Sequence, residues 1–93
     1  MAKVSRSELK NGEIVFSFFC EGCGCCHMFT SSWKFNQDFK NPTVSPSILV
    51  KHGRDGRNGI CHSFITDGKI RYLNDCTHKL AGKIVELQDF WED

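Results

Sequence analysis

The sequence predicts a small, mostly β domain of antiparallel strands, and three observations support this prediction. Apolar and polar residues alternate in "EIVFSFFC", residues 13–20, which is the period of a half-buried strand. Aromatic and β-branched residues, which favour strands, dominate the later runs. Turn dipeptides, Asn11-Gly12 and Asp67-Gly68, precede or separate these runs.

The first half of the chain supplies three strand candidates. In residues 14–20 the alternation places Ile14, Phe16, Phe18 and Cys20 on one face. The segment "HMFTSSWKF", residues 27–35, has the composition of a second strand. In "NPTVSPSILV", residues 41–50, two prolines predict an extended edge, with a strand that begins at Ile48.

The second half begins with a glycine-rich loop at residues 53–59. A hairpin then follows at residues 60–73, where two β-rich runs flank Asp67-Gly68, the signature of a type I′ turn. The segment "DCTHKLAG" predicts one short helical turn, with Asp75 as its N-cap and Gly82 just past its end. The run "KIVEL" supplies a last strand.

Length and composition limit the classes of protein to which this chain can belong. The 93 residues predict a single domain, 1–93. The chain is 40% hydrophobic and 25% charged, as in a globular domain, and its formal charge of +1 gives no global attraction to nucleic acid or acidic membranes. We find no membrane-spanning run and no signal peptide, so we expect a cytoplasmic protein whose cysteines stay reduced.

Four cysteines and a histidine crowd into residues 20–29, "CEGCGCCHMF", and this cluster predicts a zinc site. Cys20 and Cys23 have the spacing of a zinc knuckle, in which two thiolates hold one ion and the backbone N–H groups of the turn point at the first sulfur. Gly24 suits the left-handed conformation of such a turn. His27 is close enough along the chain to supply a nitrogen ligand.

A tetrahedral site needs a fourth ligand from the second half of the chain. Two packets offer one, Cys61-His62 and Cys76-Thr77-His78. Cys61 and His62 point to opposite faces of a strand, so only one of them reaches a given ion, and we favour the thiolate. The predicted ligands are therefore Cys20, Cys23, His27 and Cys61, with His62, Cys76 and His78 as alternatives for the fourth position.

We expect different roles for the two remaining cysteines of the cluster, Cys25 and Cys26. Cys26 alternates with Met28, and we expect it to be a small buried hydrophobic residue. Cys25 shares a face with His27 and is a substitute ligand.

Five motifs in order resemble a family of small zinc-site proteins from bacteriophages and bacteria that has no established activity. They are Cys-x-x-Cys-x-x-x-His, Trp-x-Phe-Asn, Pro-Thr-x-x-Pro-Ser, Cys-His-Ser-Phe and Asp-x-Thr-His-x-Leu-Ala-Gly. The resemblance covers residues 16–87. The label ammonia monooxygenase, used for some members, does not fit a chain without membrane spans or a copper centre. The resemblance implies a zinc site and marks seven positions: Cys20, Cys23, His27, Cys61, His62, Asp75 and His78.

Three functions remain open. The sequence favours a phage-type binding or regulatory module, without enzymatic activity, whose zinc is structural and whose exposed aromatic residues would anchor a host protein. A zinc-dependent hydrolase would use His62, Asp75 and His78 as catalytic candidates near an open metal position. A nucleic-acid-binding zinc ribbon would use a basic edge that consists of Lys51, Arg54, Arg57, Lys69 and Arg71.

His62, Asp75 and His78 have one further expected arrangement. If Cys61 binds the metal, His62 faces away from it, and the chain after the hairpin brings Asp75 and His78 towards His62. We therefore expect a polar cluster of these three residues that does not touch the ion. In this cluster Asp75 accepts a hydrogen bond from its own turn or from an imidazole.

Overall fold

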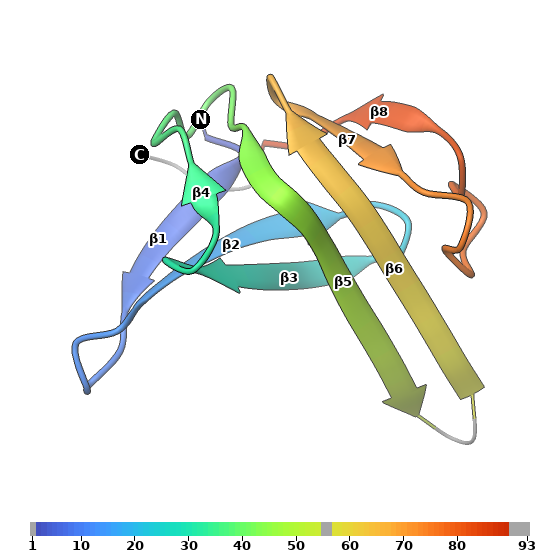
Figure 1. The fold of residues 1–93 in the computed structure, drawn as a ribbon, viewed down its shortest axis with the longest axis horizontal. Coiled ribbons are helices and arrows are strands. Elements are labelled where there is room, and N and C mark those ends of the chain that lie inside the picture. Colours follow the sequence, from blue (N-terminus) through green and yellow to red (C-terminus); the bar gives the residue numbers. More distant parts are fainter. Residues whose placement is uncertain (1, 55–56, 90–93) are drawn as a thin grey trace.

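The computed structural model describes residues 2–54 and 57–89, except for the side chains of residues 52–58, and it consists of two antiparallel sheets (Figure 1). The first sheet has the order β1-β2-β3 and is built from Val4–Glu8, Ile14–Cys20 and Cys25–Thr30. The second has the order β4-β5-β6-β7-β8 and is built from Lys34–Phe35, Val44–Arg54, Arg57–Thr66, Lys69–Tyr72 and Ile84–Glu86. The predicted fold class, a small antiparallel β domain, is therefore confirmed.

The hydrophobic core lies between the two sheets. Phe16, Phe18 and Cys20 of β2 point inward, as their alternation predicts, and Phe29 of β3 stacks on Phe16 with ring centroids 5.2 Å apart. The opposite wall is supplied by the second sheet through Val44, Ile48, Cys61, Ile65, Ile70 and Tyr72. Cys20 and Cys61 therefore belong to facing sheets and meet in the core.

The hairpin between β6 and β7 has the predicted turn. Asp67 and Gly68 both have positive φ, 53° and 78°, which a type I′ turn requires at its two central residues. The turn fixes the pairing of Thr66 with Lys69 and of Phe64 with Arg71. This register determines which side chains share the outer face of the second sheet.

Three local predictions need correction. The strand expected from Ile48 begins at Val44, because a register shift between Val44 and Ile48 accommodates Pro46 inside the strand. The loop expected at residues 53–59 is mostly paired strand, out to the pair Arg54 and Arg57, and residues 55–56 lie outside the described residues. The helical turn at residues 75–82 is a series of turns instead, and the described part of the chain contains no helix.

Cys26 also differs from its prediction. It is exposed, with Met28 on the same outward face of β3, because the inward positions are taken by His27 and Phe29. The short first strand, β1, was not expected from the sequence. It pairs with β2 from Val4↔Phe18 to Glu8↔Ile14.

Residues 2–54 and 57–89 contain no helix with the length and apolar character needed to cross a bilayer.

Candidate metal centre and active site

Three cysteines and one histidine converge on one point between the sheets. Cys20 ends β2, Cys23 lies in the turn before β3, Cys61 is on β6 and His78 lies in the segment between β7 and β8. Their ligand atoms all lie within 4.8 Å of one another. Among the described residues these four side chains form a candidate metal site with three sulfurs and one nitrogen.

The turn after β2 has the geometry of a zinc knuckle. The backbone N–H of Cys23 donates to the sulfur of Cys20 at 3.4 Å, and Gly24 closes the turn with a positive φ of 69°. The Tyr72 hydroxyl lies 3.3 Å from the same sulfur and accepts from the Gly22 backbone N–H at 3.3 Å. The backbone N–H at the first sulfur is the contact that the sequence predicts, whereas the contact with the Tyr72 hydroxyl was not expected.

The three thiols shift one another's pKa values, because they are buried or half-buried and within hydrogen-bonding distance of each other. The hydrogen bond from Cys61 lowers the pKa of Cys20 to about 3, and hydrogen bonds from His27, Tyr72 and the Cys23 backbone act in the same direction. The same contact raises the pKa of Cys61 above its usual range, and burial, helped by the Cys20 charge, raises the pKa of Cys23 to about 12. Only one of these three sulfurs is readily ionised without a cation, whereas a bound metal ion favours thiolates.

The His78 ring fits into the site because Gly22, which lies against it, has no side chain. A Cβ atom at Gly22 would overlap the His78 imidazole, and the Tyr72 ring lies edge-on to the same imidazole with ring centroids 4.6 Å apart. Nε2 of His78 is buried and has no hydrogen-bond partner among the described residues, a state that a metal ion would relieve. Nδ1 of His78 accepts a hydrogen bond from the Leu80 backbone N–H at 3.2 Å. If a metal ion binds Nε2, the ring proton moves to Nδ1, where it meets this N–H, so the contact between Nδ1 and Leu80 must lengthen.

Gly22→Ala should therefore weaken metal binding without a change in any ligand. The added methyl group displaces the His78 ring, and we expect about a tenfold or larger loss of metal affinity, comparable to the loss of an outer-shell contact. Competition with a chromogenic chelator measures it. Gly24→Asn is the matched control in the same turn, because its Cβ has open space and asparagine tolerates positive φ. Equal losses in the two variants would show that the turn, rather than His78, is responsible.

His27, the expected nitrogen ligand, lies beside this group but is not among its four members. It is buried on β3, its ring lies edge-on to Phe18 with centroids 5.8 Å apart, and it hydrogen-bonds to the thiol of Cys20. The nitrogen in the candidate cluster belongs to His78, which the sequence offered only as an alternative to Cys61 for the fourth position, and His27 as a ligand stays a prediction. β3 pairs His27 with Phe18, so both side chains point inward on the same face of the first sheet as Cys20.

A second cluster lies on the opposite, outer face of β6. Nδ1 of His62 lies 3.0 Å from a carboxylate oxygen of Asp75, and Nε2 lies 2.8 Å from the hydroxyl of Ser47. Asp75, His62 and Ser47 thus form one hydrogen-bonded chain. The expected contact between His62 and Asp75 is confirmed, and the expected separation of His62 from Cys61 on opposite faces is confirmed as well. His78 does not join this cluster.

The chemistry of the three groups sets the direction of the hydrogen bonds. An ionised carboxylate can only accept, so Nδ1 of His62 carries the proton and donates it to Asp75. Nε2 of the neutral ring is then an acceptor, and the Ser47 hydroxyl donates to it. A serine hydroxyl that donates to an imidazole held by a carboxylate is the arrangement that activates a serine nucleophile. The His62 side chain is 25% exposed, so a substrate can reach it.

The two clusters share their supporting backbone. The segment after β7 runs beside β6: Leu73 N–H donates to the His62 carbonyl at 2.9 Å, and Thr77 N–H donates to the Ile60 carbonyl at 2.9 Å. The sulfur of Cys76 lies 3.2 Å from both the backbone N–H and the carbonyl of His62. Cys61 and His78 meet in the metal cluster, so a metal ion would hold together the two segments that carry His62 and Asp75.

Comparison with protein families agrees with a serine-based site. Residues 2–73, more than half of the chain, match the family described as "Bacterial ubiquitination-like system serine protease (BubE)". The chain belongs to the BubE family. No curated protein and no solved structure matches it in the other two comparisons.

The part of the chain that matches the BubE family contains most of both clusters. It includes Cys20, Cys23, Ser47, Cys61 and His62. Asp75 and His78 follow directly after the matched range and are brought in by the tertiary structure. The family is bacterial, which agrees with one part of the resemblance found in the sequence. A phage origin stays a prediction.

Ser47 is the site residue that sequence reasoning missed in this BubE family member. It lies inside the motif Pro-Thr-x-x-Pro-Ser, but a serine after a proline in an extended segment has no local feature that marks a nucleophile. The register shift between Val44 and Ile48 places it on β5 beside His62. The basic edge expected for nucleic acid has no comparable support, and the side chains of Arg54 and Arg57 lie outside the described residues.

Proposed function

We propose that this protein is a serine protease in which Ser47 is the nucleophile, His62 the general base and Asp75 the residue that orients His62. The hydrogen-bonded chain from Asp75 through His62 to Ser47, with distances of 3.0 Å and 2.8 Å, carries the proposal. The order Ser–His–Asp along the sequence differs from that of well-known serine hydrolases, but a triad is recognised by geometry and roles rather than by order. The triad favours an enzyme over the binding module that the sequence favoured.

The proposed reaction follows from the hydrogen bonds. The Ser47 oxygen attacks the carbonyl carbon of the scissile bond while Nε2 of His62 takes the hydroxyl proton. The imidazolium then gives this proton to the leaving nitrogen, the carbon–nitrogen bond breaks, and an acyl ester remains on Ser47. Water, deprotonated by His62, hydrolyses the ester and restores the hydroxyl group. Asp75 holds the ring in the correct tautomer and stabilises its positive charge.

The metal has a structural role in this proposal. Three thiolates and one imidazole are the donor set of a closed structural zinc site, so we propose zinc as the ion. Four protein ligands leave no open position for a water molecule, which argues against the zinc-dependent hydrolase suggested by His62, Asp75 and His78. Zinc would instead fix the positions of Cys61 and His78, and through the chain those of their neighbours His62 and Asp75.

The substrate class comes from the family description. The description names a ubiquitination-like system, and from this we infer a substrate protein with a ubiquitin-like partner joined or fused to it. We propose that the chain cleaves the bond at the carboxyl end of such a partner. The position of the triad agrees with a protein substrate, because the partly exposed His62 and the exposed Asp75 lie on the outer face of the second sheet, which a folded surface can meet.

A fluorophosphonate probe tests the proposed nucleophile directly. The metal-loaded protein should form one covalent adduct, located on Ser47 by peptide mass spectrometry, because only a serine activated by a base attacks this phosphorus centre rapidly. His62→Ala should slow the labelling about a thousandfold or more, since it removes the base. An unlabelled protein, or an adduct on another serine, would contradict the proposal.

A further inference from the structure

The outer face of β6 continues past the triad. Along this strand Cys61, Ser63 and Ile65 are buried, whereas His62, Phe64 and Thr66 point outward. Phe64 is 37% exposed although it is a large hydrophobic residue. Neighbouring outward residues on one strand are about 7 Å apart, so Phe64 is the first side chain that a substrate would meet beyond His62 in this direction.

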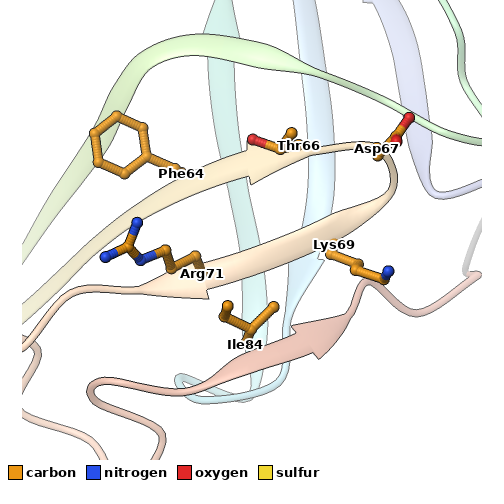
Figure 2. A pocket seen from close by; sticks show the side chains of 6 residues that line it. All are labelled: Phe64, Thr66, Asp67, Lys69, Arg71 and Ile84. Carbon is orange, nitrogen blue, oxygen red and sulfur yellow. The ribbon is translucent and has the colours of Figure 1, made fainter.

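Phe64 forms one wall of an open groove. Figure 2 shows six side chains around it, from three adjacent strands and the β6–β7 turn: Phe64, Thr66, Asp67, Lys69, Arg71 and Ile84. Its volume is about 510 Å³, enough for a short stretch of peptide. The strand register places Arg71 directly between Phe64 of β6 and Ile84 of β8. The groove therefore has a cation with an apolar side chain on each side.

The charges in the groove favour an anionic ligand. Lys69 and Arg71 line the groove together with one acidic residue, Asp67. A second carboxylate, Glu86, lies opposite Lys69 on β8 and is ion-paired with Lys3, so Arg71 is the cation of the groove that no carboxylate neutralises. Among the described residues Arg71 forms no ion pair, and the groove carboxylate Asp67 forms none either. Ile84, on the edge strand, is 62% exposed. An unpaired guanidinium between exposed apolar side chains is complementary to a carboxylate next to an apolar residue.

We infer that this groove binds an extended segment of the substrate next to the scissile bond and that Arg71 selects an acidic residue in it. This inference rests on the proposed function, since the triad defines where the scissile bond lies. Arg71 lies about 7 Å along β6 and about 5 Å across to β7 from His62, a straight-line distance of about 8–9 Å, and an extended peptide covers about 3.3 Å per residue. The acidic residue therefore lies two to four positions from the cleaved bond, with an apolar neighbour against Phe64 and Ile84.

Internally quenched nonapeptide libraries test the selection. In each library one position is fixed as Asp or Lys and the others are mixed. The wild-type protein should cleave the Asp library faster than the Lys library by about fivefold at one position near the cleavage site, the size of a partly exposed ion pair. Arg71→Gln should remove this preference, and Arg71→Glu should reverse it. Lys40→Glu, which makes the same charge change at an exposed residue outside the groove, should keep it.

Fluorophosphonate labelling separates failure of this inference from failure of the proposed function. The small probe does not fill the groove, so labelling of Ser47 in the wild type reports the triad alone, and Lys40→Glu should be labelled at the same rate. Labelling together with an Asp preference that persists in Arg71→Glu would overturn the role of Arg71. Loss of labelling in the wild type would overturn the proposed function instead.

Binding without turnover supplies the second measurement. The Ser47→Ala protein, labelled with ¹⁵N, is titrated with the acetylated tetrapeptide amide Leu-Asp-Phe-Leu and with its counterpart Leu-Lys-Phe-Leu. The acidic peptide should shift the amide resonances of Phe64, Lys69 and Arg71, and the basic peptide should shift them less. Absence of these shifts at millimolar peptide, or equal shifts with both peptides, would overturn the inference.

Discussion

Ser47→Ala should reduce hydrolysis of a protein or peptide substrate by about 10⁴-fold or more, because it removes the atom that attacks the carbonyl carbon. The measurement is single-turnover cleavage of a ubiquitin-like fusion protein. The structure of the Ser47→Ala variant should change little, because the substitution removes only the hydroxyl group of a half-buried side chain. In the wild type this hydroxyl donates to His62 at 2.8 Å. Circular dichroism and metal content should match those of the wild type.

Two further variants distinguish a triad from a serine that merely lies near a histidine. Asp75→Asn should lower the rate about 10²- to 10⁴-fold, because an amide can donate to Nδ1 and so favour the wrong tautomer of His62. Ser45→Ala changes an exposed serine on the same strand and should leave the rate unchanged. Full activity in Ser47→Ala would place the nucleophile elsewhere.

Cys20→Ser should abolish metal binding and leave the chain largely unfolded at 37 °C. The apparent binding free energy of a structural zinc ion is about 10–16 kcal/mol, comparable to or larger than the whole stability of a small domain, about 5–15 kcal/mol. Cys20 is fully buried between the sheets, where its sulfur lies 3.7 Å from that of Cys61. Thermal unfolding with and without a chelator, together with elemental analysis, measures the effect.

The other cysteines and histidines supply the controls for the metal site. Cys26→Ser should have almost no effect on stability or metal content, because Cys26 is exposed. His78→Ala should lose the metal, whereas His27→Gln should retain it while the thiol of Cys20 loses one hydrogen bond. The reverse result for the two histidines would restore His27 as the ligand. A stable, metal-free Cys20 variant would show that the core alone supports the fold.

The triad should depend on the metal, although no ligand belongs to it. Cys61 precedes His62, and His78 follows three residues after Asp75. A metal ion bound by both Cys61 and His78 would therefore link the segment that carries His62 to the segment that carries Asp75. The same experiment with the chelator therefore has a second readout. Fluorophosphonate labelling of Ser47 should fall at chelator concentrations that remove the metal, even while part of the sheet structure remains.

Local sequence patterns were sufficient for much of the fold. Alternation along residues 14–20 and 60–66 predicts which side chains enter the core, because a strand turns successive residues to opposite faces. Asp67-Gly68 predicts the β6–β7 hairpin, because these residues tolerate positive φ. Where a local rule competed with tertiary packing it failed: the strand was expected to begin after Pro46, at Ile48, but it begins at Val44, since the register shift between Val44 and Ile48 accommodates the proline.

The sequence by itself determined the knuckle, the inward direction of Cys61 and the outward direction of His62, because spacing and strand alternation are short-range properties. Only the tertiary structure decided the nitrogen in the metal cluster and the serine in the triad. The segment after β7 returns alongside β6, which brings His78 to the sulfurs and Asp75 to His62, and the register shift of β5 places Ser47 on the other side of the ring. These contacts join residues 13 to 58 positions apart, and pairing between distant segments depends on the packing of both sheets rather than on any local pattern.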